Sequence, residues 1–318
     1  MEGTMEVLLA VLVGFLGLCI LFHLIFVRGK TCRNKTSLRG KTVLLTGGNT
    51  GIGKATALDL ARRGARVVLA CRSRDRGEAA VQDIRKESGN KEVVFMSLDL
   101  ASLSSVRAFA EAFLRLEPRL DILINNAALI KDGASEDGFN VVFQVNHLAH
   151  FLLTHLLLDR LKQCAPSRVV VLSSDAHRSG RIDFQSIHLP VEGYLDAFKS
   201  YCNSKLVNIF HVRELANRLE GTDVTSYAVH PGAVHTEALR HSPSYLKPFI
   251  RGFTWLLFKN PENGAQTSIY CATQEGIEKL SGCYFEDCRQ KDPKLNARDP
   301  MLAKKLWEFS EKLLGLAS

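Results

Sequence analysis

The stretch Thr46-Gly47-Gly48-Asn49-Thr50-Gly51-Ile52-Gly53 decides how this chain folds. An apolar run at 42–45 precedes it and predicts a short buried strand, and apolar residues recur at helical spacing over 52–63 after it. Glycines let a backbone approach a pyrophosphate closely, and a helix N-terminus offers free N–H groups and the positive end of its dipole. Although the spacing differs from the common G-x-G-x-x-G pattern, the stretch predicts a dinucleotide site. A plain tight turn is the alternative.

Composition places the chain among globular proteins, because 46% of its 318 residues are hydrophobic and 23% are charged. The formal net charge is +8, but no basic helix and no aromatic-interleaved basic patch occurs, so we expect no nucleic-acid partner. The eight cysteines follow no regular spacing, and Cys283 and Cys288 have no second close pair for zinc. We therefore expect no metal site, and free thiols in a reducing compartment.

The N-terminal segment Val7–Val27 contains no Asp, Glu, Lys or Arg and is long enough to span a bilayer as a helix. Residues 1–6 carry acids but no base, and no clear small-x-small cleavage site follows. These features favour an uncleaved anchor over a cleaved signal peptide, which would make the protein secreted. The basic flank from Arg28 to Lys41 predicts that the rest of the chain faces the cytosol. We expect an anchor at 1–28, a basic linker at 29–40 and one domain at 41–318.

Strand and helix patterns alternate through the rest of the chain. After the first strand, strands are expected at 66–70, 93–98, 121–125, 168–173 and 224–229, with a possible seventh at 282–285. Further helices are expected at 75–87, 102–116, 139–164, 201–219 and 299–314. The helix at 139–164 is apolar nearly all round, which predicts burial within the fold or at a subunit contact. The alternation predicts an α/β fold, a single Rossmann-like doubly wound parallel sheet covered on both faces.

Six motifs occur in a fixed order: Thr46-Gly47-x-x-x-Gly51-x-Gly53, Asp99-Leu100, Asn125-Asn126-Ala127, Ser173-Ser174, Tyr201-x-x-x-Lys205 and His230-Pro231-Gly232. Because of these six motifs, the segment from residue 41 to about 285 resembles the short-chain dehydrogenase/reductase family. Ala70-Cys71-Arg72-Ser73, the stretch 145–151 and the N-terminal anchor are similar to the membrane-anchored retinol dehydrogenases of the 11-to-14 type and the related dehydrogenase/reductase group. The resemblance implies an oxidoreductase of the endoplasmic reticulum membrane that acts on a small apolar alcohol or aldehyde, retinoid-like or another lipid, as a possible homodimer.

Tyr201 and Lys205 lie four residues apart and so share one face of a helix. A nearby ammonium favours a phenolate, so Tyr201 is expected to have a lowered pKa and to exchange the hydroxyl proton while a nicotinamide carries the hydride. An ordinary amphipathic helix is the alternative for such a pair alone. By resemblance, Lys205 also holds the nicotinamide ribose, and Asn146 supports that lysine through a water. Ser174 is the expected hydrogen-bond donor to the substrate oxygen, with Ser173 as the alternative.

Charge after the second expected strand indicates the cofactor. An NAD-binding protein carries an acid there, whereas this chain has Cys71-Arg72, and a guanidinium suits the 2′-phosphate of NADP. The alternative is that Arg72 is only a surface charge. Resemblance places Asp99 beside the adenine. The other expected cofactor contacts are Gly47, Asn49, Gly51, Ile52, Gly53, Asn126, Pro231, and Tyr201 with Lys205. Ala128 stands where the family has a glycine, and its methyl group is expected to shift that loop slightly.

The stretch 233–260 follows the sixth expected strand and is rich in large apolar residues, among them Phe249, Phe253 and Trp255. Ligands of α/β folds bind at the carboxyl ends of the strands, so this stretch predicts an apolar lid over the substrate. A second membrane contact and plain core packing are the alternatives. A competing function is a membrane-tethered cofactor-binding or scaffold protein with little turnover. Intact Ser174, Tyr201 and Lys205 argue against that function.

Overall fold

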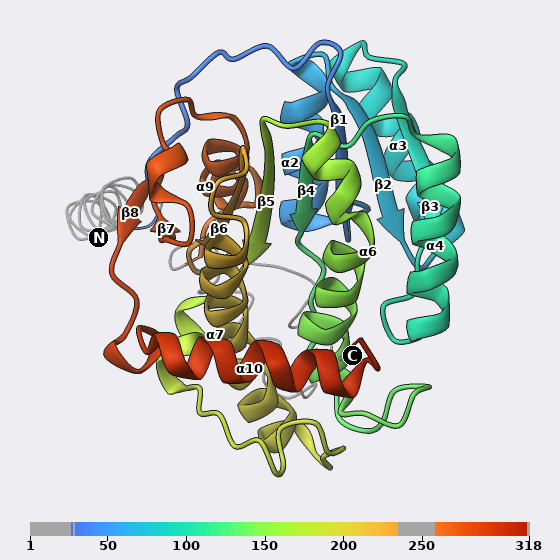
Figure 1. Ribbon diagram of the computed structural model, residues 1–318. Helices are drawn as coiled ribbons and strands as arrows, with labels where there is room; N and C mark the ends of the chain where they lie inside the picture. The colour runs from blue at the N-terminus through green and yellow to red at the C-terminus, as the bar shows by residue number, and fades with distance from the viewer. Residues whose placement is uncertain (1–26, 28, 235–257, 317–318) are drawn as a thin grey trace, which may run out of the picture.

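The computed structural model describes residues 27, 29–234 and 258–316, and within them the chain builds one eight-stranded sheet (Figure 1). The strands are β1 (Thr42–Thr46), β2 (Arg66–Cys71), β3 (Val93–Ser97), β4 (Ile122–Asn125), β5 (Ser167–Leu172), β6 (Val224–His230), β7 (Tyr284–Glu286) and β8 (Arg289–Lys291). Their order is β3-β2-β1-β4-β5-β6-β7-β8. All neighbours are parallel except β7 and β8, which confirms the predicted parallel α/β sheet.

The strand order reverses between β1 and β4, and this reversal positions the site. The chain runs from β1 outward to β2 and β3, then returns to add β4 on the other side of β1. Leu44 of β1 pairs in register with Val68 of β2 and with Leu123 of β4, and all three side chains are fully buried. A crevice forms outside the carboxyl ends of strands at such a reversal, and it is the usual ligand site of this fold class.

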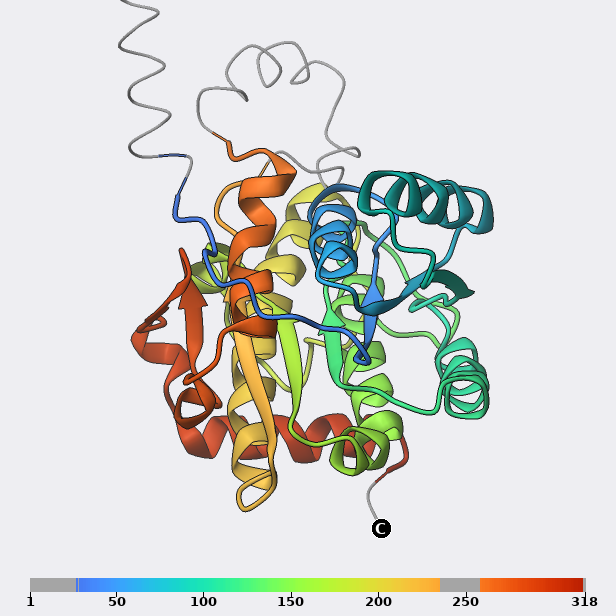
Figure 2. The same cartoon turned by 90° about the horizontal axis from the view of Figure 1, so that it is seen from above.

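Helices cover both faces of the sheet (Figure 2). One apolar core contains residues of α2 (Gly51–Arg62), α3 (Arg74–Ser88) and α9 (Pro261–Thr273). The other core contains residues of α4 (Leu103–Leu116), α6 (Ala149–Gln163), α7 (Tyr194–Arg218) and α10 (Pro300–Leu313). Because side chains alternate along a strand, Val43 and Leu45 of β1 enter the first core and Leu44 enters the second. The burial of both faces explains the continuously apolar strands.

The predicted long apolar helix forms as a continuous segment over Val141–Gln163. It begins as α5 (Val141–Phe143), continues through a π-helical turn, Gln144–Leu148, and becomes α6. Among the described residues it is the one helix that is long and apolar enough to cross a membrane, but 83% of its most apolar window is buried inside the fold. It is therefore a core helix, in agreement with the predicted burial.

Several elements differ from the sequence prediction. α7 begins at Tyr194 rather than at 201, directly after Gly193. α9 was not predicted, although Asn260 caps it through a 2.8 Å hydrogen bond from the Asn263 N–H and a proline follows the cap. β8 was also missed. It is short and solvent-facing, and its turn residues, Asp287 and Cys288, adopt positive φ without the usual glycine signal.

Two predicted features fall on residues outside the described ranges. The anchor covers 1–28, of which only Val27 is described, and most of the predicted lid lies in 235–257. The basic linker at 29–40 is described and is hydrogen-bonded to the domain. Asn34, for example, accepts hydrogen bonds from Arg63, the residue after α2, at 2.7 Å and from Thr273 of α9 at 3.1 Å.

Candidate active site

The glycine turn between β1 and α2 is packed too tightly for side chains. A Cβ on Gly53 would lie 2.3 Å from the carbonyl oxygen of Gly47, and Gly47 itself has φ +69°. The residue before α2, Thr50, makes no side-chain cap hydrogen bond, and the first turn of α2 carries no acid. The N–H groups of this turn are therefore available to an anion, which fits the pyrophosphate of a dinucleotide.

Thr46, at the end of β1, ties the glycine turn to the loop after β4. Its hydroxyl oxygen accepts hydrogen bonds from the backbone N–H groups of Asn126 at 3.0 Å and Ala127 at 3.1 Å. The Asn126 side-chain amide in turn donates to the Thr46 carbonyl oxygen at 2.8 Å. The predicted cofactor residue Asn126 therefore buttresses the turn that holds Gly47. The sequence placed Thr46 at the head of the glycine motif but gave no sign of this role, because a threonine at a strand end carries no spacing signal of its own.

His150 of α6 lies behind Thr46 and continues this network. Its Nε2 is 2.9 Å from the Thr46 hydroxyl, and its Nδ1 is 3.4 Å from the carbonyl oxygen of Asn146. The Thr46 oxygen already accepts two N–H groups, so its own proton has two acceptors, the His150 Nε2 at 2.9 Å and the Ile124 carbonyl oxygen at 3.5 Å. Donation to the nearer Nε2 leaves the histidine proton on Nδ1. Burial lowers the pKa of His150 to about 3, so the ring is neutral at physiological pH. His150 lies within the stretch 145–151, whose spacing gave no sign of this role.

Arg72 and Asp99 follow β2 and β3 at the same edge of the sheet. The Arg72 Nε lies 4.0 Å from an Asp99 carboxylate oxygen, and 68% of the Arg72 side chain is exposed. The other Asp99 oxygen accepts a 2.9 Å hydrogen bond from the Ala101 N–H, which fixes the carboxylate. Lys54, which also follows the glycines, instead pairs with Asp83 of α3 at 2.5 Å. Arg72 is therefore the better placed of these two cations to meet a phosphate beside the glycine turn.

Ser174, Tyr201 and Lys205 meet at the carboxyl end of β5. Ser174 follows β5, and its hydroxyl is close enough to the Tyr201 phenol to lower the pKa of that phenol. The Lys205 ammonium donates a 3.0 Å hydrogen bond to the Leu172 carbonyl oxygen and lies 5.4 Å from the centre of the Tyr201 ring. The hydroxyl of Ser173 points elsewhere and donates to the Lys205 carbonyl oxygen at 2.7 Å. Of the two candidate serines, Ser174 is the one beside Tyr201.

Burial controls the titration of this group. Burial raises the pKa of Tyr201, and the nearby Ser174 hydroxyl offsets only part of that rise. Burial also lowers the pKa of Lys205 to about 7. The structure therefore differs from the expected lowering of the Tyr201 pKa by Lys205, because loss of solvation opposes both charged forms. At neutral pH the phenol keeps its proton and can donate it.

Asn146 lies in the π-helical turn, fully buried between the loop after β4 and α7. Its Oδ1 accepts from the Leu129 N–H at 2.9 Å, and its Nδ2 donates to the Leu129 carbonyl oxygen at 3.1 Å. The same Nδ2 is 3.1 Å from the hydroxyl of Ser204, the residue before Lys205. Asn146 therefore links the loop of Asn126 to the helix of Tyr201. Such π-helical turns are frequent at functional sites.

A cavity of about 530 Å³ opens beside Ser174, at the carboxyl ends of β5, β6 and β7. Its other lining residues are Asp175, Arg178, His230, Gly232, Ala233, Glu286 and Lys291. Two ion pairs border it, Arg178 with Asp175 and Lys291 with Glu286, the latter at 3.0 Å. The His230 Nδ1 accepts a hydrogen bond from the Asp175 N–H at 3.2 Å. Pro231 therefore follows a strand end that borders this cavity.

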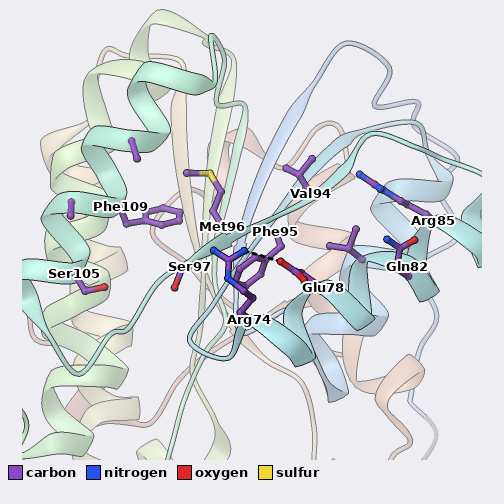
Figure 3. Close-up of a pocket in the computed structure, with 13 residues that line it drawn as sticks. Arg74, Glu78, Gln82, Arg85, Val94, Phe95, Met96, Ser97, Ser105 and Phe109 are labelled. Carbon is purple, nitrogen blue, oxygen red and sulfur yellow. Dashed lines mark hydrogen bonds and ion pairs between the residues drawn. The ribbon is translucent and has the colours of Figure 1, made fainter.

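A second cavity, of about 540 Å³, lies at the open edge of the sheet along β3 (Figure 3). Arg74 and Glu78 of α3 form an ion pair within it, and Phe95 of β3 and Phe109 of α4 supply apolar walls. None of the candidate cofactor or catalytic residues lines this cavity. The described chemistry therefore gathers at the carboxyl ends of the strands and not here.

The fold and the site define an oxidoreductase of the dinucleotide-binding class, and the family model for short chain dehydrogenases matches residues 41–245. The chain belongs to this family, as its motifs predicted. It is 57% identical to the bovine (Bos taurus) Dehydrogenase/reductase SDR family member 13, over 98% of this chain and 83% of that protein. It is 50% identical to Retinol dehydrogenase 11 of Mus musculus, over 90% of each chain. The predicted similarity to retinol dehydrogenases is therefore confirmed.

Solved structures show the same fold. An uncharacterized Mycobacterium paratuberculosis protein matches with a TM-score of 0.72 and 32% identity, over 90% of this chain and 98% of that one. The Pseudomonas aeruginosa RhlG/NADP active-site complex matches with a TM-score of 0.63 and 28% identity, over 78% of this chain and 95% of that one.

Proposed function

We propose that this protein is an NADP-dependent oxidoreductase that interconverts an apolar alcohol, retinol-like or another lipid, and its aldehyde or ketone. The observation that carries the proposal is the grouping of Ser174, Tyr201 and Lys205 at the carboxyl end of a parallel sheet, with the Lys205 ammonium 5.4 Å from the centre of the Tyr201 ring. A relative at 50% identity is a retinol dehydrogenase, and a structural neighbour is a complex with NADP. These names support the substrate class and the cofactor.

The glycine turn and the cation beside it fit NADP. In this assignment the N–H groups of Gly51, Ile52 and Gly53 meet the pyrophosphate, together with the backbone of Gly47 and Asn49. Arg72 meets the 2′-phosphate through its guanidinium. The remaining contacts come from the strand ends and α7, namely Asp99, Asn126, Pro231, Tyr201 and Lys205. Bound NADPH supplies the hydride that reduces the carbonyl carbon.

The residues of this chain handle the proton. Tyr201 keeps its phenolic proton at neutral pH and gives it to the substrate oxygen as that oxygen gains negative charge. Ser174 holds the same oxygen through its hydroxyl and so orients the substrate. Lys205, fixed on the Leu172 carbonyl oxygen, lies below the Tyr201 ring and is the residue we assign to the nicotinamide ribose. A protonated Tyr201 is the form that carbonyl reduction requires.

The protein is further proposed to be anchored in the endoplasmic reticulum membrane by its N-terminal segment, with the domain in the cytosol. The uncharged stretch Val7–Val27 and the basic residues that follow it support this location. A homodimer is also part of the proposal. The long apolar helix Val141–Gln163 is mostly buried inside the fold, so the contact between the two subunits would use another surface.

Turnover of an aldehyde series by the purified full chain in detergent tests this function. With NADPH, kcat/KM should rise as the aldehyde lengthens from four to twelve carbons. Each buried CH₂ group should lower the free energy of the transition state by roughly 0.8 kcal/mol, until the pocket is full. Tyr201→Phe should lower kcat by about 10²–10⁴-fold while NADPH affinity stays within about two-fold. NADPH binding without turnover of any aldehyde or alcohol in the wild-type protein would instead favour the scaffold function. A preference for the shortest aldehyde would remove the lipid substrate.

A further inference from the structure

Lys259 is a buried cation outside the Ser174–Tyr201–Lys205 group, and only 9% of its side chain is exposed. Its ammonium pairs with the carboxylate of Asp287, in the turn between β7 and β8, at 2.7 Å. Its backbone N–H donates to the Ala233 carbonyl oxygen at 2.7 Å, and Lys259 pairs with Val234 in a short parallel bridge. Lys259 therefore joins the chain that leaves β6 to the turn after β7.

The lysine side chain also fills the space beside two glycines that are far apart in sequence. A Cβ on Gly232 would lie 2.6 Å from the Lys259 Cε, and a Cβ on Gly29 would lie 2.4 Å from its Nζ. Both glycines have positive φ, at +88° and +72°, which other residues rarely adopt. Gly29 begins the linker after the predicted anchor, and Gly232 lines the cavity beside Ser174. One side chain therefore contacts both the linker and the cavity wall.

The Asp287 carboxylate is ionised at neutral pH. Burial by itself would raise the pKa of Asp287, but the hydrogen bond and the positive charge of Lys259 outweigh burial and hold that pKa below its ordinary value. Removing Asp287 leaves the buried Lys259 ammonium without its carboxylate partner, and the surrounding backbone then rearranges to solvate it. Removing the Lys259 ammonium takes away the group that lies beside both Gly29 and Gly232. The backbone closest to the ammonium is at Gly29, Gly232 and the Asp287 turn.

We propose that Lys259 and Asp287 are positioning residues that hold the Pro231–Gly232 turn against the linker, and that they set the cavity wall beside Ser174. This inference rests on the proposed function, because the turn is where we place a cofactor contact. The pair does not touch Ser174, Tyr201 or Lys205, so it acts on binding more than on chemistry. The chain near the predicted anchor and the substrate cavity are thereby coupled through a single buried contact.

The first experiment compares Lys259→Met and Asp287→Asn with wild type, as full chains in detergent. Both variants should raise KM for the aldehyde and Kd for NADPH by at least about five-fold, with kcat within about three-fold. Lys41→Met is the matched control, because Lys41 pairs with Asp121 at 3.0 Å. Both residues lie at the amino ends of their strands, β1 and β4, and so at the end of the sheet away from the site. Lys41→Met should leave KM and Kd unchanged. A lower Tm with unchanged KM and Kd in both test variants would overturn the proposal.

The second experiment keeps both charged residues and introduces one methyl group into the linker. Gly29→Ala places a methyl 2.4 Å from the Lys259 Nζ and 2.6 Å from the Asp287 Oδ1, which forces the ion pair to shift. Gly40→Ala introduces a methyl at a similar φ, +75°, with no atom within 4 Å, so only Gly29→Ala should raise KM and Kd. Equal values for the two would contradict the coupling. NADPH Kd is measured without turnover, so a wild-type chain inactive on every aldehyde would refute the proposed function and not this inference.

Discussion

The hydroxyl of Ser173 donates a 2.7 Å hydrogen bond to the backbone carbonyl oxygen of Lys205, so the end of β5 is fastened to the middle of α7. The next residue, Ser174, is extended, and its hydroxyl lies near the Tyr201 phenol instead, one helical turn earlier in α7. Ser173 therefore holds β5 against α7. Ser174 remains the serine that can contact a substrate.

Alanine substitutions at the two serines should therefore affect different properties, catalysis for Ser174 and stability for Ser173. Ser174→Ala should lower kcat by about 10²–10³-fold, because it removes a donor to the developing oxyanion. Ser173→Ala should lower the free energy of unfolding by about 1 kcal/mol, because the buried Lys205 carbonyl loses a donor. Steady-state kinetics and urea unfolding on both variants measure this. A larger kcat loss for Ser173→Ala would reverse the assignment.

Cofactor preference should depend on Arg72. We expect tighter binding of NADPH than of NADH by the wild type, and Arg72→Ala should weaken NADPH binding alone, since only NADPH carries the 2′-phosphate. Fluorescence titration of both cofactors measures the two dissociation constants. Arg74→Ala is the control, because Arg74 pairs with Glu78 along α3 at 2.9 Å and should leave both affinities unchanged. Equal wild-type affinities for the two cofactors would refute the NADP assignment.

Acid should destabilise the domain through its buried histidines. His211 of α7 stacks on Trp307 of α10, and neither ring nitrogen has a hydrogen-bond partner among the described residues. Burial lowers the pKa of His211 to about 4, so the folded state holds the neutral ring while the unfolded chain takes up a proton below about pH 6.5. Stability from this group is complete above that pH. It falls by about 1.4 kcal/mol per pH unit as pH drops toward 4.

Between pH 6.5 and 4, unfolding of wild type takes up about one proton at His211. His211→Phe should remove that uptake, so its unfolding free energy should depend less steeply on pH in this range. Urea unfolding at several pH values measures this slope. His155→Gln is the control, because His155 is exposed on α6 and should leave the slope unchanged. An unchanged slope in His211→Phe would show that this ring does not stay neutral in the folded state.

Membrane topology can be tested on sealed microsomes. The basic residues after Val27 predict a cytosolic domain, so added protease should remove the domain without detergent. The mature protein should retain the stretch Val7–Val27. A domain that survives protease until detergent is added, or a mature N-terminus after Val27, would show that the segment acts as a signal peptide instead.

The sequence by itself determined the parallel sheet, the glycine turn and the family. Strand and helix periods are local properties, and the spacing of Tyr201 and Lys205 fixes their common helix face without any tertiary contact. The ends of most strands were predictable to within one or two residues for the same reason. β8 and the early start of α7 were not, because an exposed three-residue strand and a polar helical turn have no apolar period to detect.

Only the tertiary structure decided which polar groups meet. It turned Ser173 inward onto Lys205, placed His150 behind Thr46, and joined Gly29 to Gly232 through Lys259. It also raised the pKa of Tyr201 where spacing alone had predicted a lower one, since burial of the phenol outweighs its neighbours. Contacts and desolvation between residues distant in sequence depend on how helices and strands pack, and residue spacing carries no record of that packing.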